Sequence, residues 1–420
     1  MIKLYLFLTD LIIPMFFGYI YVSFISTQKE SIDLQFYNFI FFSFTLILVS
    51  SIQNYYTNYY AKHFSEKIKI SFITFFIAFF IQLMLHLLFG LFLEFELVVL
   101  WIIISFVILL ARNQIKKYCK NINSVAINII GTYYQFNDSE ILILTEKGFT
   151  LFFYDSFKDF QEIYKCKNYN ETVNVINYKN DKLNDLKDYE HIIISNNCIL
   201  VDKFMESYLR KIFIDYRSVI IDTQTYSQSE IFLKRLIDYG AVLFFIPILF
   251  IFCILIYIIK LNHNINDSLL FIQKRYGLNK KIFNVYKIRT MHIDSKKTGN
   301  TIKDDPRIYP FASIIRKLRI DELPQAFNIL FGDMHLVGPR AEWINLADQY
   351  SNNIINYNYR HIVRPGITGW AQIIHPYGVD EEDARQKLMY DIYYIQNWSI
   401  WFEIEICIKT FMVILDKRGF

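Results

Sequence analysis

Residues 304–340 read DDPRIYPFASIIRKLRIDELPQAFNILFGDMHLVGPR, and they place carboxylates among basic side chains in a chain that is otherwise rich in apolar residues. Two adjacent carboxylates, Asp321 and Glu322, precede the helix-breaking Pro324. Basic side chains lie close by in the sequence: Arg307, Arg316, Lys317, Arg319 and Arg340. Arginines neutralise phosphate oxygens, and a carboxylate among them can attack phosphorus or hold a metal ion. Such charges also form surface salt bridges, so the pattern leaves open a phosphate site or a solvated ion-pair cluster.

The chain has 420 residues, enough for two to four domains, and its 54% of hydrophobic residues are concentrated in long runs. The net charge of +4 comes without a basic tract, which argues against a nucleic-acid partner and suits an anionic membrane surface and anionic substrates. The five cysteines are scattered and form no CxxC pair, which predicts reduced thiols with neither a disulfide framework nor a zinc site.

Four apolar runs occupy residues 4–25, 34–52, 70–93 and 97–111, with no cleavage pattern typical of a signal peptide after the first. Their lengths predict a four-helix transmembrane bundle over residues 1–111. Asp10 is expected either to face the interior of the bundle or to lie at the membrane interface. Basic residues follow the second and fourth runs, which places both ends of the bundle at the cytoplasm: Lys62, Lys67, Lys69, Arg112, Lys116, Lys117 and Lys120.

Residues 112–230 change in character and predict a small α/β domain with a partly parallel sheet. Strands are expected at 125–130, 140–144, 191–195 and 218–221. A dinucleotide-binding fold would need a glycine-rich turn after its first strand, but only Gly131 follows, and Tyr133 and Tyr134 come next. The pattern therefore favours a structural or regulatory role over nucleotide binding.

A fifth apolar run, within residues 231–262, contains Pro247 and is flanked by basic residues on both sides. Because both flanks are basic, loop charge does not decide whether the run crosses the membrane. Pro247 would bend a helix, so the run is either a re-entrant helix broken at the proline or a straight fifth span.

Residues 282–289 alternate between apolar and polar side chains, which predicts a strand. Lys287 and Arg289 would share one face of it, as a phosphate clamp or as a solvated basic face. Residues 310–320 have the pattern of a helix with an apolar side and a basic side. Near the C-terminus, residues 391–420 predict an aromatic-rich amphipathic helix, which lies in the membrane interface, packs on the catalytic domain, or does both.

Five motifs of this region resemble the bacterial sugar transferase family, the monotopic phosphoglycosyl transferases, in the same order and spacing. They are Lys287–Met291, Asp305-Pro306-Arg307, Asp321–Gln325, Leu336–Arg340 and Arg364–Gln372. The resemblance runs from about residue 231 to the C-terminus. The bundle and the α/β domain ahead of it are similar to the long-chain branch of the family, which starts O-antigen, capsule or exopolysaccharide synthesis.

The resemblance implies that sugar 1-phosphate passes from a UDP-sugar to undecaprenyl phosphate with release of UMP. By the same analogy, Asp321 forms a phosphosugar-enzyme intermediate and Glu322 holds Mg²⁺. Phosphate contacts are expected from the basic residues of the motifs: Lys287, Arg289, Arg307, Arg316 and Arg340. The family's re-entrant helix, broken at a proline, matches Pro247 and would place the site on the cytoplasmic side of the bacterial inner membrane.

The expected architecture is an α-helical transmembrane bundle (1–111), a small α/β domain (112–230), a re-entrant membrane helix (231–262) and a mainly α (α+β) catalytic domain (263–420). The sequence departs from the family pattern at Ile246, Lys280, Ala312, His335 and Ala341. His335 and His375 are expected to have packing or surface roles. Two rival functions remain: a non-catalytic scaffold of a polysaccharide assembly complex, and a glycosyltransferase that releases UDP. The sequence does not identify the sugar, and a homodimer is compatible with it.

Overall fold

The structure is a computed structural model, and the parts of the chain that it describes are residues 2–20, 39–40, 42–44, 46–47, 50, 64–88, 100, 103–104, 107–108, 111, 125–156, 158–160, 172–178, 198–214, 226–263, 265, 267–292, 307–309, 311–375, 378 and 380–415. The chain divides into two compact units, Met1–Phe204 and Met205–Phe420. The predicted strands at 191–195 and 218–221 lie outside the described residues.

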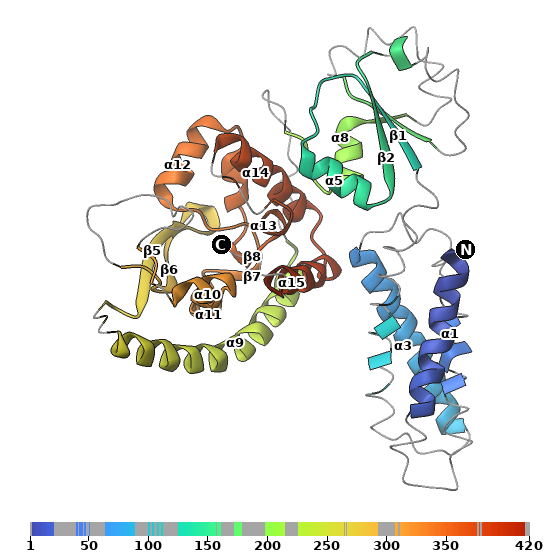
Figure 1. Cartoon of the computed structure of the whole chain (residues 1–420), viewed down its shortest axis with the longest axis horizontal. Helices are drawn as coiled ribbons and strands as arrows, with labels where there is room; N and C mark the ends of the chain where they lie inside the picture. Colours follow the sequence, from blue (N-terminus) through green and yellow to red (C-terminus); the bar gives the residue numbers. More distant parts are fainter. Residues whose placement is uncertain are drawn as a thin grey trace. The chain divides into compact units, whose positions relative to one another are not determined.

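The first unit begins with helices α1 (Ile2–Ile20) and α3 (Phe64–Leu88), and the described residues between 39 and 50 and between 100 and 111 are helical as well (Figure 1). All four predicted runs contribute to one apolar core, in which Phe39, Phe42 and Ile104 are fully buried. Asp10 is also fully buried, which favours the interior position over the interfacial one expected for it. That these runs span a membrane as a four-helix bundle stays a prediction.

The rest of the first unit contains a four-stranded parallel sheet in the order β2-β1-β3-β4. The strands are β1 (Val125–Ile130), β2 (Phe149–Tyr154), β3 (Thr172–Ile176) and β4 (Cys198–Leu200), and the helices are α5 (Asp138–Glu146) and α8 (Val201–Phe204). The predicted α/β character is confirmed, as is the strand at 125–130. The predicted strand at 140–144 is wrong, because Asn137 and Glu140 form a capping box that starts α5 there.

The two central strands, β1 and β3, end where an open parallel sheet usually binds its ligand. Here the side chain of Asn177 accepts a hydrogen bond from the Tyr134 N–H and donates to the carbonyls of Gly131 and Tyr134. The Gly131 N–H donates to the Tyr154 carbonyl. A Cβ atom at Gly131 would lie 2.4 Å from the Asn177 carbonyl oxygen, so the turn is closed by protein groups rather than open to a pyrophosphate.

The second unit is mainly helical and has two small sheets. Its helices are α9 (Gln228–Asn262), α10 (Ala312–Lys317), α11 (Gln325–Phe331), α12 (Ile344–Asn353), α13 (Trp370–Ile374), α14 (Glu381–Gln396) and α15 (Ile400–Leu415). Strands β5 (Leu270–Tyr276) and β6 (Ile282–Ile288) form an antiparallel hairpin, and β7 (His335–Val337) pairs in parallel with β8 (Gly366–Thr368). Short helical turns complete the unit: η4 (Met205–Leu209), η5 (Leu278–Lys280), η6 (Ile320–Glu322) and η7 (Tyr357–His361). This arrangement confirms the predicted strand at 282–289 and the predicted α+β class.

Helix α15 packs on the second unit, which was one of the two alternatives predicted for the C-terminal segment. Phe402 and Ile406 are buried in a core that they share with Trp370 and Tyr394, so the helix packs on the unit. The predicted segment is not one helix, because α14 ends at Gln396 before α15 begins at Ile400.

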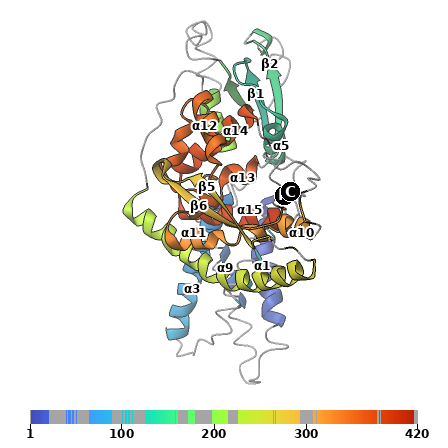
Figure 2. The ribbon, with the colours of Figure 1, turned by 90° about the vertical axis from the view of Figure 1, so that its left-hand side faces the viewer.

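Helix α9 is the one helix in the described part of the chain that is long and apolar enough to cross a membrane. It continues through Pro247 as a single helical element, and Figure 1 shows it bent along its length. The re-entrant course predicted for it stays a prediction. One side of the helix is buried on both sides of the proline, at Val242, Leu249 and Ile256, and this packing holds the two halves in one helix. Figure 2 shows α9 running along the unit beneath α11 and the β5–β6 hairpin.

Asp238 of α9 bonds the helix to β7. Its Oδ1 accepts the Leu336 N–H at 2.7 Å, and its Oδ2 lies 2.6 Å from the His335 Nδ1. Burial lowers the pKa of His335 to about 4, although the hydrogen bond to Asp238 opposes this shift. His335 therefore has the packing role that was predicted for it.

The burial of His335 predicts a loss of stability in acid. Unfolded histidine binds a proton near pH 6.5, whereas His335 in the folded chain stays neutral down to about pH 4. Stability should therefore fall by about 3 kcal/mol as the pH drops through this interval. Thermal unfolding of the detergent-solubilised chain between pH 4 and 7 measures it. His335→Ser should weaken the dependence of stability on pH. His292→Gln, at an exposed histidine, should leave this dependence unchanged. Equal slopes of stability against pH for the wild type and both variants would contradict the role given to His335.

Candidate active site

The two carboxylates lie in a tight turn between α10 and α11. Arg319 has a φ of 57°, in the left-handed region, and this turn of the backbone follows the end of α10 at Lys317. The predicted helix at 310–320 is therefore shorter than its sequence pattern. Ile320–Glu322 form a 3₁₀ turn. Pro324 then precedes α11 as its N-cap, a position where its missing N–H costs no helix hydrogen bond.

Glu322 is buried and is bound by cations from three separate segments. Lys287 of β6 donates a hydrogen bond to Oε1 at 2.9 Å. The Nη1 atom of Arg340 lies 3.7 Å from Oε1, and that of Arg319 lies 3.6 Å from Oε2. Burial alone would raise the pKa of Glu322, but Lys287, Arg340 and Arg319 together hold it well below its usual range. Glu322 is thus an anion at neutral pH.

Asp321 has a different environment, although it is the adjacent residue. Burial and the charge of Glu322 raise the pKa of Asp321 to about 6, against the opposing charges of Lys287, Arg316 and Arg319. Its Oδ1 atom is buried and has no hydrogen-bond partner within the described protein, and the same is true of the Arg316 Nη1. Buried polar atoms are normally paired, so these two atoms indicate a place for a ligand.

Close backbone packing brings Arg340 to the carboxylates. A Cβ atom at Gly366 would lie 2.0 Å from the Gly338 backbone nitrogen, and one at Gly369 would lie 2.2 Å from the Gly338 carbonyl oxygen. These glycines let β7 and β8 approach each other, and Arg340 forms a backbone bridge with Gly366 just after β7. The glycines of the two motifs are therefore explained by geometry.

The structure gathers some of the predicted site residues and not others. Lys287, Arg316 and Arg340 act on the carboxylate pair, as described above. Arg289 donates a hydrogen bond to the Ser268 hydroxyl at 3.1 Å, and the phosphate clamp with Lys287 stays a prediction. The carbonyl of Arg307 accepts a hydrogen bond from the His292 N–H. Asp304 and Asp305 lie outside the described residues.

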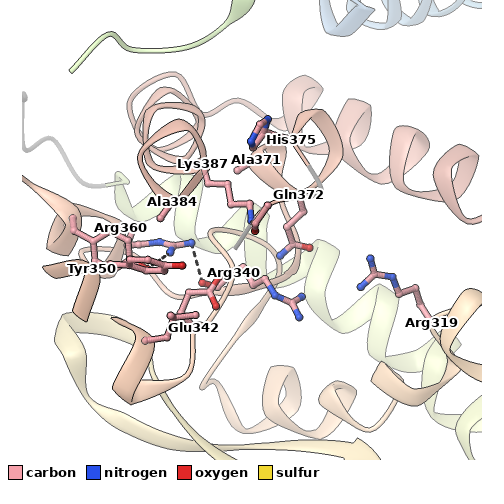
Figure 3. A pocket seen from close by; sticks show the side chains of 13 residues that line it. Arg319, Arg340, Glu342, Tyr350, Arg360, Ala371, Gln372, His375, Ala384 and Lys387 are labelled. Carbon is pink, nitrogen blue, oxygen red and sulfur yellow. Dashed lines mark hydrogen bonds between the residues drawn. The ribbon is translucent and has the colours of Figure 1, made fainter. Parts of the chain in front are cut away.

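A pocket of about 240 Å³ adjoins the pair, because Arg319 and Arg340 line it and also contact Glu322. Figure 3 shows Arg319 and Arg360 at opposite ends of the pocket, with Arg340 between them. The lining has four strongly basic side chains, the fourth being Lys387 of α14, and a single carboxylate, Glu342. The pocket is therefore suited to an anion with more than one negative charge.

Several lining residues were not singled out from the sequence. The Gln372 Nε2 is buried without a partner in the described chain, and this residue belongs to one of the five motifs. Arg319 was named only as one of the basic residues beside the carboxylates and not as a phosphate contact, and its left-handed backbone gave no signal. Arg360, Lys387 and Glu342 lie in other segments, and only the fold brings them together.

The acidic residues of the site are few. Within the described ranges, no group of three or more His, Cys, Asp or Glu side chains gathers in a way that could hold a metal ion. Magnesium is commonly bound through one or two carboxylates together with substrate phosphates. Asp321 and Glu322, with the unpartnered Asp321 Oδ1, fit this donor set.

The second unit contains the region that matches a known protein family. The profile of the family described as bacterial sugar transferase matches residues 229–417. The chain is 43% identical over 190 residues to the UDP-N-acetylgalactosamine-undecaprenyl-phosphate N-acetylgalactosaminephosphotransferase of Aeromonas hydrophila, which is 45% of each chain. It is 37% identical over 190 residues to the uncharacterized sugar transferase EpsL of Bacillus subtilis, covering 44% of this chain and 89% of that protein.

A third relative is the UDP-glucose:undecaprenyl-phosphate glucose-1-phosphate transferase of Xanthomonas campestris, 39% identical over 154 residues, which are 35% of this chain and 32% of the relative. The chain thus spans less than half the length of the Aeromonas and Xanthomonas relatives.

The contact between Lys287 and Glu322 predicts strong coupling between the two side chains. Lys287→Met and Glu322→Gln each leave a buried charge with less compensation, and each should lower the free energy of unfolding. The double variant should lose less than the sum of the two, by about 1–3 kcal/mol. Chemical unfolding of the four proteins measures this cycle. The pair Arg385–Glu382, in which the carboxylate is 53% exposed rather than buried, provides a matched cycle, for which at most about 1 kcal/mol is expected. Equal coupling in both cycles would show that Glu322 is not held as described.

Proposed function

The chain belongs to the bacterial sugar transferase family, and from this premise we propose that it transfers a sugar 1-phosphate from a UDP-sugar to undecaprenyl phosphate, releasing UMP. The observation that carries the proposal is the unpartnered carboxylate oxygen of Asp321, buried beside an ionised Glu322 and surrounded by basic side chains. The substrates named for the Aeromonas and Xanthomonas relatives, UDP-sugars and undecaprenyl phosphate, support this choice.

The reaction proceeds in two displacements at one phosphorus atom. The Asp321 carboxylate attacks the phosphorus that carries the sugar, a bond from Asp321 oxygen to phosphorus forms, and the bond to the UMP oxygen breaks. A phosphate oxygen of undecaprenyl phosphate then attacks the same phosphorus and frees Asp321. Two anions that would repel each other in a direct transfer are thus brought together in separate steps.

Basic side chains reduce this repulsion. Lys287, Arg319 and Arg340 hold Glu322 ionised, and Arg316, which also acts on Asp321, has an unpartnered buried N–H group to offer to a phosphate oxygen. Asp321 and Glu322 would hold Mg²⁺, which supplies further positive charge to the phosphate oxygens when bound.

The adjoining pocket receives the nucleotide half of the donor. UMP leaves as a phosphate anion, which suits the positive charge that Arg319, Arg340 and Lys387 bring to the pocket. Arg360 is already paired with the buried Asp391 at 2.9 Å. Arg319 and Arg340 lie between Glu322 and the rest of the pocket, where they can contact the diphosphate. The unpartnered Gln372 Nε2 is a hydrogen-bond donor for an oxygen of the nucleotide.

Helix α9 supports a site on one side of the membrane. Near its start, Lys234 forms an ion pair with Glu403 at 2.7 Å, and near its end, Lys260 donates to the Asp267 carbonyl at 2.8 Å. Because the same unit holds both ends, the helix would enter the bilayer and return rather than cross it. UDP-sugars are cytoplasmic, so the catalytic unit lies at the cytoplasmic face of the inner membrane in this proposal. There it would begin exopolysaccharide, capsule or O-antigen synthesis.

Replacing the nucleophile tests the mechanism. Asp321→Asn cannot form the acyl phosphate and should lower the rate of UMP release by more than about a thousandfold, with loss of any covalent phosphosugar adduct. Radiolabelled UDP-sugars, with UMP and adduct both quantified, provide the measurement. Asp333→Asn, at another carboxylate of the same unit, is the control and should retain activity. An active Asp321→Asn enzyme, or release of UDP in place of UMP, would refute the proposed reaction.

The assignment of the pocket predicts a uniform effect on donor binding. Lys387→Met removes one positive charge from the pocket and should raise the KM about tenfold. The increase in KM should be the same for UDP-glucose, UDP-galactose and UDP-N-acetylgalactosamine, because the variant would affect contacts with the nucleotide, which all three donors share. Steady-state kinetics with each donor measure it, with Lys280→Met on the β5–β6 turn as a control. A factor that depends on the sugar would place the sugar, not the nucleotide, in this pocket.

A further inference from the structure

Residues 210–214, here called the strap, lie ahead of the family-matched region but are built into the second unit. Arg210 is 6% exposed and Lys211 is fully buried. Ile214 belongs to a core that contains Leu388 and Met389 of α14, and the Ile212 N–H donates to the Met389 carbonyl at 3.1 Å. The strap is thus a structural part of the unit and not only a connection to it.

Arg210 holds the start of α13. Its carbonyl accepts a hydrogen bond from the Trp370 indole N–H at 3.0 Å. Its guanidinium carbon lies 4.7 Å from the centre of the Phe402 ring and 5.6 Å from that of the Trp370 ring, within cation–π range of both. The Nη1 atom forms an ion pair with Glu405 of α15 at 2.7 Å. Backbone and side chain of one residue therefore fix Trp370 in its position.

Lys211 holds α14 in a similar way. Its ammonium group donates a hydrogen bond to the Gln386 side-chain oxygen and lies 5.2 Å from the centre of the Tyr390 ring. The strap therefore contacts both α13 and α14 through buried charged groups.

These two helices form part of the wall of the cationic pocket. Helix α13 contributes Ala371 and Gln372, which directly follow Trp370, and α14 contributes Ala384 and Lys387, the latter directly after Gln386. Each lining pair thus stands next to, or close to, a residue that the strap holds. A displacement of the strap would move the pocket wall and leave the turn that carries Asp321 in place.

The strap is costly to form. Burying a guanidinium and an ammonium group removes both from water, which only well-placed partners offset. Arg210 also has a φ of 54°, in a region of backbone conformation that residues other than glycine rarely adopt. Strained backbone and buried charge persist at positions where the surrounding structure depends on them. A segment whose only task was to connect two units would need neither feature.

We propose that the strap belongs to the donor-binding apparatus, with Arg210 as a positioning residue that holds Trp370 and so places Gln372 at the nucleotide half of the pocket. The inference rests on the proposed function for the identity of the ligand, a uridine nucleotide. It extends the functional unit upstream of residue 229, where the family match begins. Loss of the strap contacts weakens nucleotide binding and leaves the transfer step at Asp321 nearly unchanged.

The test uses the full-length chain in detergent or nanodiscs. Arg210→Gly removes the side chain at a φ that glycine adopts freely, so the backbone carbonyl keeps its place. The KM for the UDP-sugar and the Kd of UMP, measured by calorimetry, should each rise about tenfold, while kcat changes by less than about twofold. Arg210→Lys, which retains the charge, should recover part of the loss. Arg385→Ala, an arginine of α14 paired at the surface with Glu382, is the matched control and should bind UMP as the wild type does.

A second variant keeps the test decisive if Arg210→Gly does not fold. Trp370→Phe retains an aromatic ring but removes the N–H that donates to the Arg210 carbonyl, and it should raise the same two constants. Unchanged UMP affinity in both variants, or a fall in kcat alone, would overturn the proposal. If the wild-type chain released UMP from no UDP-sugar, the proposed function would fail, whereas the UMP-binding measurement would still decide the role of the strap.

Discussion

An ionised carboxylate buried at Glu322 is the constraint on which this site depends. A buried charge is tolerated only with close compensation, and Glu322 receives it from Lys287, Arg319 and Arg340. These cations come from β6, from the turn after α10 and from the segment after β7. Satisfying one carboxylate therefore fixes three separate parts of the fold against each other, and the cations that neutralise Glu322 are the ones that a phosphate would meet.

The neighbouring carboxylates of Asp321 and Glu322 differ in protonation behaviour and in hydrogen bonding because their surroundings differ. The cations that compensate Glu322 leave it ionised and engaged, so it is poorly suited to attack phosphorus. Asp321 has an unpartnered oxygen and a pKa raised to about 6 by burial and by Glu322, which makes it more basic than an ordinary aspartate. A more basic carboxylate is a better nucleophile, and it is still ionised at neutral pH. The proposed division into nucleophile and charge partner would thus follow from the positions of the two residues within a single turn.

The sequence predicted the elements whose signals are local. Periodicity was enough to predict the strand at 282–289 and the α/β character of residues 112–230. The motifs were enough to predict that Lys287 and Arg340 lie near the two carboxylates. The strand expected at 140–144 failed because the capping box at Asn137 outweighed a run of isoleucine and leucine. The hydrogen bond of Arg289 to Ser268 could not be predicted, because the alternation of a strand says nothing about the partner of a side chain at its end. Most of the pocket escaped prediction because its lining residues are far apart in the chain.

The course of α9 depends on its packing against the second unit as well as on Pro247. Neighbouring residues on this helix differ sharply, with Val242 5% exposed and Leu243 79% exposed. The buried side packs along the catalytic unit, and the other side is apolar without a protein partner among the described residues. A span surrounded by lipid would have no such difference, since a separate globular unit cannot cover one side of it from end to end. Packing of α9 on the unit, before and after Pro247, is therefore a physical feature that would keep the site at one membrane surface, where a soluble donor and a lipid acceptor could both reach Asp321.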